Sequence, residues 1–311
     1  MSFPYRKAGL SERQAAAHLL SRFTYGPGPG QVDEVVSMGL EKWFAQQLDG
    51  AEPDDSLGQV LDRYDALKLT NEQVINIYPR AGQVVRMAIR DGVVNKDSVK
   101  ADRKEYRDLI QSYMQEKGYK REQELFRQFI CQKILRAAYS QNQLREVMTD
   151  FWFNHFNVSI TKNDCAEFIP AYERDVIRPS ALGSFSDLLI KTASSPAMSY
   201  YLDNFNSSVP MNNRGLNENY AREVMELHTL GVDGGYTQQD VTQAARVLTG
   251  WGVYPMTEQA RGVVARFSED QLARKGFVHN GDFSSTPTAM IREKRWYLDT
   301  FFPLTEDMKK A

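Results

Sequence analysis

The sequence contains only two cysteines in 311 residues, Cys131 and Cys165, and they stand far apart. Neither belongs to a CxxC pair or to a Cys/His spacing of the kind that binds zinc. We therefore expect two buried thiols rather than a disulfide or a metal site. Long apolar runs are also missing, since no segment approaches the roughly 18 residues that a membrane span requires. The opening residues MSFPYRKAGLSERQ lack the apolar core of a secretory signal peptide.

The sequence also has no large excess of positive or of negative charge. The 38 basic and 40 acidic residues leave a net charge of −2, so the overall balance does not favour nucleic acid or an anionic membrane as a partner. The nucleophile elbow GxSxG, the P-loop and the dinucleotide fingerprint GxGxxG do not occur. What remains is an ordinary soluble composition, with 42% hydrophobic and 25% charged residues.

Period-two alternation is scarce, whereas apolar residues recur every three or four positions along most of the chain. Ser11 and Gln14 predict a capping box at the start of a first helix, which the GPGPG segment at 26–30 ends. A later helix over 142–156 carries an apolar stripe made of Leu144, Val147, Met148, Phe151 and His155. We predict an all-α protein, an irregular multi-helix domain with little or no sheet.

The stretch richest in polar chemistry is NENYAREVMELHTLGVDGGYTQQDVTQAARVLTGW, from Asn217 to Trp251. It predicts a helix over 217–230 and a second helix that begins after Thr237, with a capping box to Asp240. Successive residues of an α-helix are rotated by about 100°, so the residues of the first helix fall on two faces. The apolar face holds Tyr220, Ala221, Val224, Leu227 and His228, and the opposite face holds Asn219, Arg222, Glu223 and Glu226.

No standard metal motif fits this stretch. Glu226 and His228 are two residues apart and point to nearly opposite sides of a helix, whereas di-iron bundles use Glu-x-x-His and zincins use two His at i, i+4. The segment DGGYTQQD at 233–240 lacks the EF-hand pattern. Metal and cofactor identity stay open.

Two predicted helices each direct one histidine inward, His155 from the segment FWFNHF and His228 from the later stretch. Either both are neutral core side chains held by hydrogen bonds, or they share a pocket in which an imidazole acts as acid, base or ligand. For the second interpretation we name His155, His228, Asn154 and Glu223 as candidate catalytic residues. Candidate binding residues are Asn217, Asn219, Arg222 and Glu226. Arg222 is also suited to a simple i, i+4 ion pair.

Three long motifs resemble the domain-of-unknown-function 1800 family of large bacterial proteins. They are HLLSRFTYGPGPGQVDEVVSMGLEKWFAQQL at 18–48, REVMTDFWFNHF at 145–156, and SSPAMSYYLDN at 194–204 followed by the 217–251 stretch. The resemblance implies a mainly helical protein without an assigned activity. Members are often exported, and often encoded beside a sulfatase-like protein of the domain-of-unknown-function 1501 family, a possible partner. Because this chain shows no export signal, its localisation stays open.

The family continues after this stretch with a pattern F-x-F-N-x-x-x-H-D-x-G-E-K and a further helical half, whereas this chain reads FSSTPTAMIREKRWYLDTFFPLTEDMKKA. If residues 289–291 are encoded as GCC ATG ATT, a shift of one base reads His-Asp, and the following codons can give Gly-Glu-Lys. We infer a frameshift near Phe283. Residues 1–283 are then a truncated family domain, and residues 284–311 are an out-of-frame tail.

Two functions fit these patterns. Every polar residue named above has a structural role available to it, which favours a structural or assembly module working with a partner protein. The alternative is an enzyme or a cofactor- or metal-binding protein that uses the inward-facing His155 and His228 with nearby Asn, Glu and Arg.

Overall fold

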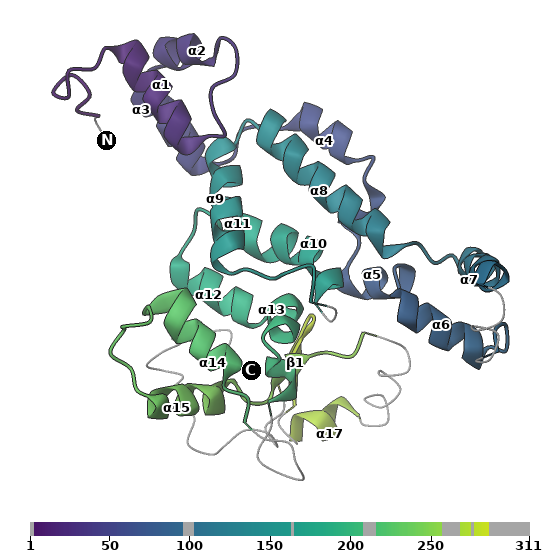
Figure 1. Cartoon of the computed structure of the whole chain (residues 1–311). Coiled ribbons are helices and arrows are strands. Elements are labelled where there is room, and N and C mark those ends of the chain that lie inside the picture. Colours follow the sequence, from purple (N-terminus) through teal and green to yellow (C-terminus); the bar gives the residue numbers. More distant parts are fainter. Residues whose placement is uncertain are drawn as a thin grey trace.

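The computed structural model describes residues 3–95, 103–162, 165–207, 216–256, 268–274 and 277–285. Helices dominate these ranges, and the strands form one small antiparallel sheet (Figure 1). The prediction of an all-α protein with little sheet is therefore confirmed. None of the described helices is both long and apolar enough to cross a membrane. The out-of-frame tail expected after residue 283 falls almost entirely outside the described residues, so it stays a prediction.

The first three helices form a unit at one end of the molecule (Figure 1). They are α1 (Glu12–Phe23), α2 (Gln31–Met38) and α3 (Leu40–Asp49). Ser11 and Gln14 make the predicted capping box at the start of α1. The unit has its own apolar cluster, which is separate from the main core. One of its polar connections to the rest is Gln47, which donates to the Gln141 carbonyl and accepts from the Leu144 N–H.

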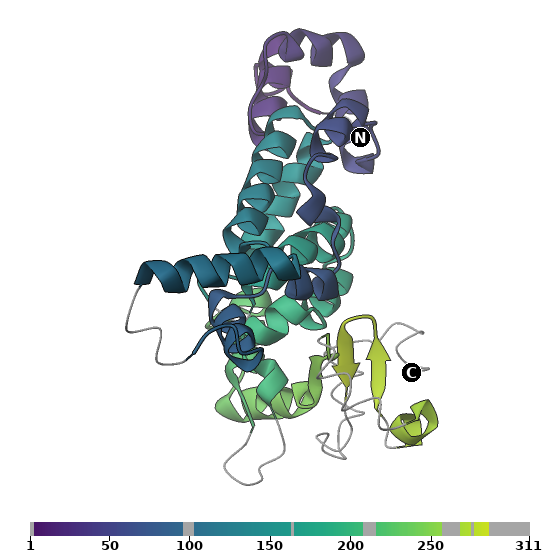
Figure 2. The same ribbon diagram turned by 90° about the vertical axis from the view of Figure 1, so that its right-hand side faces the viewer.

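A second group of helices reaches sideways from the body. It comprises α4 (Asp55–Leu61), η1 (Asp65–Lys68), α5 (Asn71–Ile77), α6 (Ala81–Arg90) and α7 (Arg103–Lys117). Helices α6 and α7 pack on each other around a small cluster of their own, and α7 projects from the side of the molecule (Figure 2). Arg80 at the start of α6 ties this group to the body, because its guanidinium makes two hydrogen bonds, of 2.6 and 2.7 Å, to Glu167.

The main core lies where the middle helices meet. These are α8 (Glu122–Tyr139), α9 (Gln143–His155), α12 (Phe185–Ala193), α13 (Pro196–Tyr201) and the short η5 (Asn204–Asn206). A continuous helix over 166–180 joins them. It changes from 3-10 (η3, Ala166–Phe168) to α (α10, Ile169–Ala171), to π (η4, Tyr172–Ile177) and back to α (α11, Arg178–Ser180). On α8, Leu125 and Phe129 are buried in the interior, whereas Ile130 and Ile134 are exposed.

The helices after Asn217 pack against the main core and contribute buried side chains to it. Its first helix is α14 (Asn219–Glu223), which continues as a π-helix, η6 (Val224–Thr229), and α15 (Gln238–Leu248) follows. Thr237 and Asp240 form the predicted capping box. The expected burial of Val224 is confirmed, and Leu248 of α15 is buried as well, but Leu227 is 60% exposed. The reason is the π-helix: its wider turn rotates Leu227 off the buried face, whereas His228, one residue later, stays buried.

The sheet follows α15 and pairs three short strands in the order β1 (Trp251–Val253), β3 (Phe283–Ser285) and β2 (Val278–Asn280). Trp251 faces Ser285 and Val253 faces Phe283 in the antiparallel register. The short helix α17 (Glu269–Arg274) lies in the same region. Trp251 is buried in the main core, so the sheet is anchored there by its first residue.

A buried network of charges joins three of the core elements. Arg178 pairs with Glu146 of α9 and, at 2.5 Å, with Glu173 of η4. Lys133 of α8 also binds Glu173, at 2.7 Å. Both glutamates are almost fully buried. Burial alone would raise the pKa of Glu173, but Arg178 and Lys133 hold it below its usual range. The network therefore locks α8, α9 and the 166–180 helix together in one arrangement.

Arg178→Met should lower the free energy of unfolding by about 3–5 kcal/mol, because it leaves two buried carboxylates without their shared partner. The matched control is Arg127→Met, which breaks the exposed pair of Arg127 with Glu124 and should cost less than about 1 kcal/mol. Chemical unfolding at pH 7 measures both. Equal losses in the two variants would show that the network does not hold the helices.

Candidate functional site

His155 ends α9 within a group of aromatic rings. Its ring stacks on Phe151 with centroids 6.3 Å apart and lies edge-on to Trp152 at 5.6 Å. Phe185 from the start of α12 approaches to 6.4 Å. The Trp152 Nε1–H donates to the Ala181 carbonyl, which fixes the indole. His155 is therefore half-buried among aromatic rings. The prediction that Phe151 lies on the buried stripe is wrong, because this side chain is exposed.

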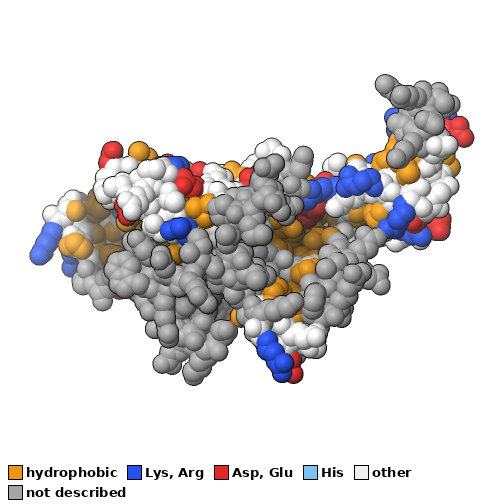
Figure 3. Space-filling view, turned by 90° about the horizontal axis from the view of Figure 1, so that it is seen from below, with side chains coloured by type: hydrophobic (Ala, Val, Ile, Leu, Met, Phe, Trp, Pro, Cys, Tyr) orange, Lys and Arg blue, Asp and Glu red, His pale blue; other side chains and the backbone are white. Residues whose placement is uncertain are grey.

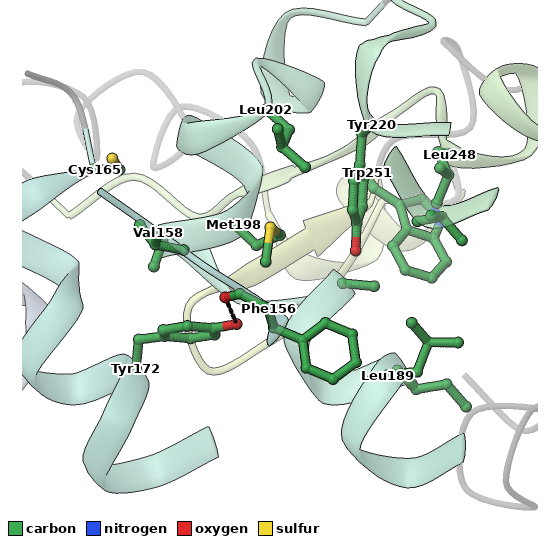
Figure 4. Packing of buried hydrophobic residues seen from close by; sticks show 14 of the residues in the cluster. Phe156, Val158, Cys165, Tyr172, Leu189, Met198, Leu202, Tyr220, Leu248 and Trp251 are labelled. Carbon is green, nitrogen blue, oxygen red and sulfur yellow. Dashed lines mark hydrogen bonds between the residues drawn. The ribbon is translucent and has the colours of Figure 1, made fainter. Parts of the chain in front are cut away.

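His228 lies near the end of the π-helix η6 and is only 6% exposed. Its ring packs against Phe156, with centroids 5.0 Å apart, and against Tyr220 at 6.4 Å. Figure 4 shows the hydroxyl end of Tyr220 pointing into the cluster that also holds Met198 and Phe156. The Tyr220 hydroxyl and the His228 Nδ1 atom are both buried and have no hydrogen-bond partner among the described residues.

The structure brings the two histidines together. The His155 Nε2 atom lies 3.0 Å from the His228 carbonyl oxygen, and the ring centroids are 6.1 Å apart. Because a carbonyl can only accept, the Nε2 atom carries a proton and donates it. The contact is thus between a ring and a backbone group, and it ties the end of α9 to the end of η6.

Burial, with a smaller contribution from like-charge repulsion by the neighbouring His155, lowers the pKa of His228 to about 4. At neutral pH the His228 ring is therefore uncharged. A general base works best with a pKa near the working pH, so His228 is a weak base in this setting. Neither imidazole hydrogen-bonds a hydroxyl or a thiol among the residues that the structure describes.

The other candidate catalytic residues lie apart from this contact. The Asn154 amide is exposed, and within the described part of the chain it donates to the Asp150 carbonyl one turn earlier in its own helix. Glu223 is half-buried. Burial raises the pKa of its carboxyl, and repulsion from Glu226 adds to the shift. No described hydrogen bond connects Asn154 or Glu223 to either histidine.

The candidate binding residues carry structural contacts. The Asn217 amide donates to the Asp203 carbonyl at 2.9 Å and accepts from the Asn219 N–H at 2.9 Å. The Asn219 amide donates to the Leu202 carbonyl. Asp203 has a left-handed backbone, with φ +58°, so the two asparagines hold a tight turn at the end of α13.

Arg222 makes the i, i+4 ion pairs that its spacing indicates. Its guanidinium lies 3.5 Å from Glu218 on one side and 3.5 Å from Glu226 on the other, and it also hydrogen-bonds Gln238 of α15. Glu218 reaches Thr242 at 2.7 Å. These contacts join α14 to α15. The catalytic and binding roles of all the candidate residues stay predictions.

A metal centre has no ready ligand set in the described ranges, where no group of three or more His, Cys, Asp or Glu side chains is placed to hold an ion. Both cysteines are free thiols. Cys165 is fully buried, and burial raises its pKa to about 11.

Sequence reasoning missed the buried network of Glu146, Glu173 and Arg178. Glu146 belongs to the motif REVMTDFWFNHF, and the other two lie in YERDVIR at 172–178. The available signal was the presence of charged residues inside otherwise apolar helical stretches. Tyr25, from the segment after α1, donates to the Glu146 carbonyl, and burial raises the pKa of this tyrosine to about 12.

Comparison with known proteins gives a family but no activity. The model of the family described as "Protein of unknown function (DUF1800)" matches residues 18–295, so the chain belongs to the domain-of-unknown-function 1800 family. No curated protein and no solved structure matches the chain.

Asn217→Ala should destabilise the protein by about 1–3 kcal/mol, because the Asp203 carbonyl and the Asn219 N–H lose their partner. Asn154→Ala is the matched control and should change stability by less than about 0.5 kcal/mol, since that amide is exposed. Thermal and urea unfolding measure both. A larger loss for Asn154→Ala would contradict the structural role assigned to Asn217.

Proposed function

We propose that this protein is a structural or assembly module that binds a partner protein. The proposal rests on a contrast between the polar and the apolar side chains of the motifs that identify the family. The side chains of Asn217, Asn219 and Arg222 bind the protein's own backbone or neighbouring carboxylates, whereas several apolar side chains of the same motifs are exposed. Leu227 is 60% and Phe151 53% exposed, although both lie in these motifs. Exposed apolar side chains that gather in one region are typical of protein-binding surfaces.

These side chains flank the contact between the two histidines. Phe151 stacks on His155, Phe185 approaches the same ring, and Leu227 directly precedes His228 in η6. We call the surface formed by Phe151, Phe185 and Leu227 the aromatic surface. Aromatic side chains supply much of the binding energy in protein interfaces. The face seen from below in Figure 3 carries acidic and basic side chains interspersed with apolar ones, and the net charge is −2. Both suit a protein partner better than nucleic acid.

The partner that we propose is a protein of the domain-of-unknown-function 1501 family, as the family resemblance implies. The alternative is an enzyme or cofactor-binding protein built on His155 and His228, with Asn154 and Glu223 nearby. What weighs against it is the low pKa of His228 and the internal hydrogen bond of the Asn154 amide.

The test is co-purification with the domain-of-unknown-function 1501 protein encoded by the same source. The double variant Phe151→Ser, Leu227→Ser should weaken the complex at least about tenfold, because central interface side chains are worth 1–2 kcal/mol or more each. Ile134→Ser is the matched control, since Ile134 is 63% exposed on α8 and lies outside the aromatic surface. This variant should bind like the unchanged protein.

Equal weakening in both variants would show that the aromatic surface is not the binding surface. If no complex forms with the unchanged protein, the proposed partner is wrong. A stoichiometric metal or cofactor in the purified protein would contradict the module and favour the enzyme.

A further inference from the structure

Different kinds of contact hold the two π-helical segments of the core, η4 and η6. In η4, Glu173 is fixed by ion pairs from Arg178 and Lys133. In η6, His228 is held by apolar packing and by the hydrogen bond that its carbonyl accepts from His155. A π-helix carries one residue more per hydrogen-bonded turn than an α-helix. It persists only where the surrounding contacts favour it, so the contacts of His228 decide whether η6 keeps this form.

Few charges reach the His228 ring. From α9 it meets the imidazole of His155 and the uncharged Phe156, and from α14 it meets Tyr220, whose pKa is raised by burial. On its own segment Glu226 pairs with Arg222. Within the described ranges, the one charge that acts noticeably on His228 is that of His155, and it has the same sign.

Protonation affects the two histidines differently. The hydrogen bond between them uses a ring N–H of His155, which is present whether His155 is neutral or charged. A protonated His228 needs an acceptor at Nδ1, and this buried atom has no described partner. A positive charge there also lacks a carboxylate to pair with, which makes it costly to bury.

We propose that His228 is an acid-sensitive latch: its neutral ring holds the π-helical segment Val224–Thr229 against α9, and protonation releases that segment. On release, the hydrogen bond from His155 to the His228 carbonyl breaks. Val224 and Met225, which are buried in the folded structure, then become exposed. The latch acts within this chain and does not depend on the proposed partner.

The direction of the pH effect follows from burial. The pKa of His228 falls from 6.5 to about 4 in the folded protein. The unfolded or released form therefore binds more protons between these values. The latch is at full strength above pH 6.5, and it weakens as the pH falls towards 4.

The experiment is a pH titration of the intact protein by NMR, from pH 8 to 3.5. The sequence has four histidines, so the His228 signals are assigned by comparison with a variant that lacks this ring. We expect His228 to titrate near 4, well below the usual histidine value of about 6.5. Amide protection in 224–229, corrected for intrinsic exchange, should fall at least tenfold with the His228 transition, while protection in α1 persists.

Two variants complete the test. His228→Phe keeps a ring in the pocket without a titrating group, so protection in 224–229 should no longer change over this pH range. His18→Gln, at an exposed site, should behave like the unchanged protein. If His228→Phe does not fold, the titration of the unchanged protein decides.

Three results would overturn the latch. His228 could titrate at the usual histidine value of about 6.5, the 224–229 segment could keep its protection when His228 is protonated, or protection could be lost in all helices at once. The last result would mean ordinary acid unfolding.

Discussion

The ion pairs of Arg178 are the constraint on which the other core contacts depend. Arg178 joins Glu146 on α9 to Glu173 on η4, and Lys133 adds α8 to the same group. Buried carboxylates are tolerated only when they are paired, so this arrangement permits little movement between the three elements. Helix α9 then supports both ends of the molecule. In its first turn the Leu144 N–H donates to the Gln47 side chain of the N-terminal unit, and the ring of its last residue, His155, donates to the His228 carbonyl of η6.

Much of the fold could be predicted because its signals are local. The capping boxes at Ser11 and Thr237 depend on residues three positions apart, and both form as expected. The charge network could not be predicted in the same way. A glutamate in a helix usually marks the solvent-facing side, but Glu146 is buried and paired with Arg178, which lies 32 residues later in the sequence.

The candidate site was predictable in part. Helical periodicity placed His155 and His228 on inward faces, and their rings lie 6.1 Å apart. The same reasoning failed for Leu227, because it assumed α-helical rotation beyond Val224. A π-helix arises from tertiary packing, and sequence spacing does not indicate it. Asn217 and Asn219 were named as binding residues, yet their partners are the backbone carbonyls of Leu202 and Asp203. The turn at Asp203 lies 14 residues before Asn217 in the sequence, and nothing in the residues between the two positions indicates that they meet.

Glu173 and His228 both have a lowered pKa, for opposite reasons. Ion pairs stabilise the charged form of Glu173, whereas burial destabilises the charged form of His228. Acid therefore weakens both π-helical segments, but at different pH. The contribution of His228 is lost between pH 6.5 and about 4. That of Glu173 is complete above its usual pKa of 4.5 and is lost only as the pH falls through its lowered value. The charge network thus keeps α8, α9 and the 166–180 helix together over most of the range in which His228 titrates, which allows η6 to respond to acid alone.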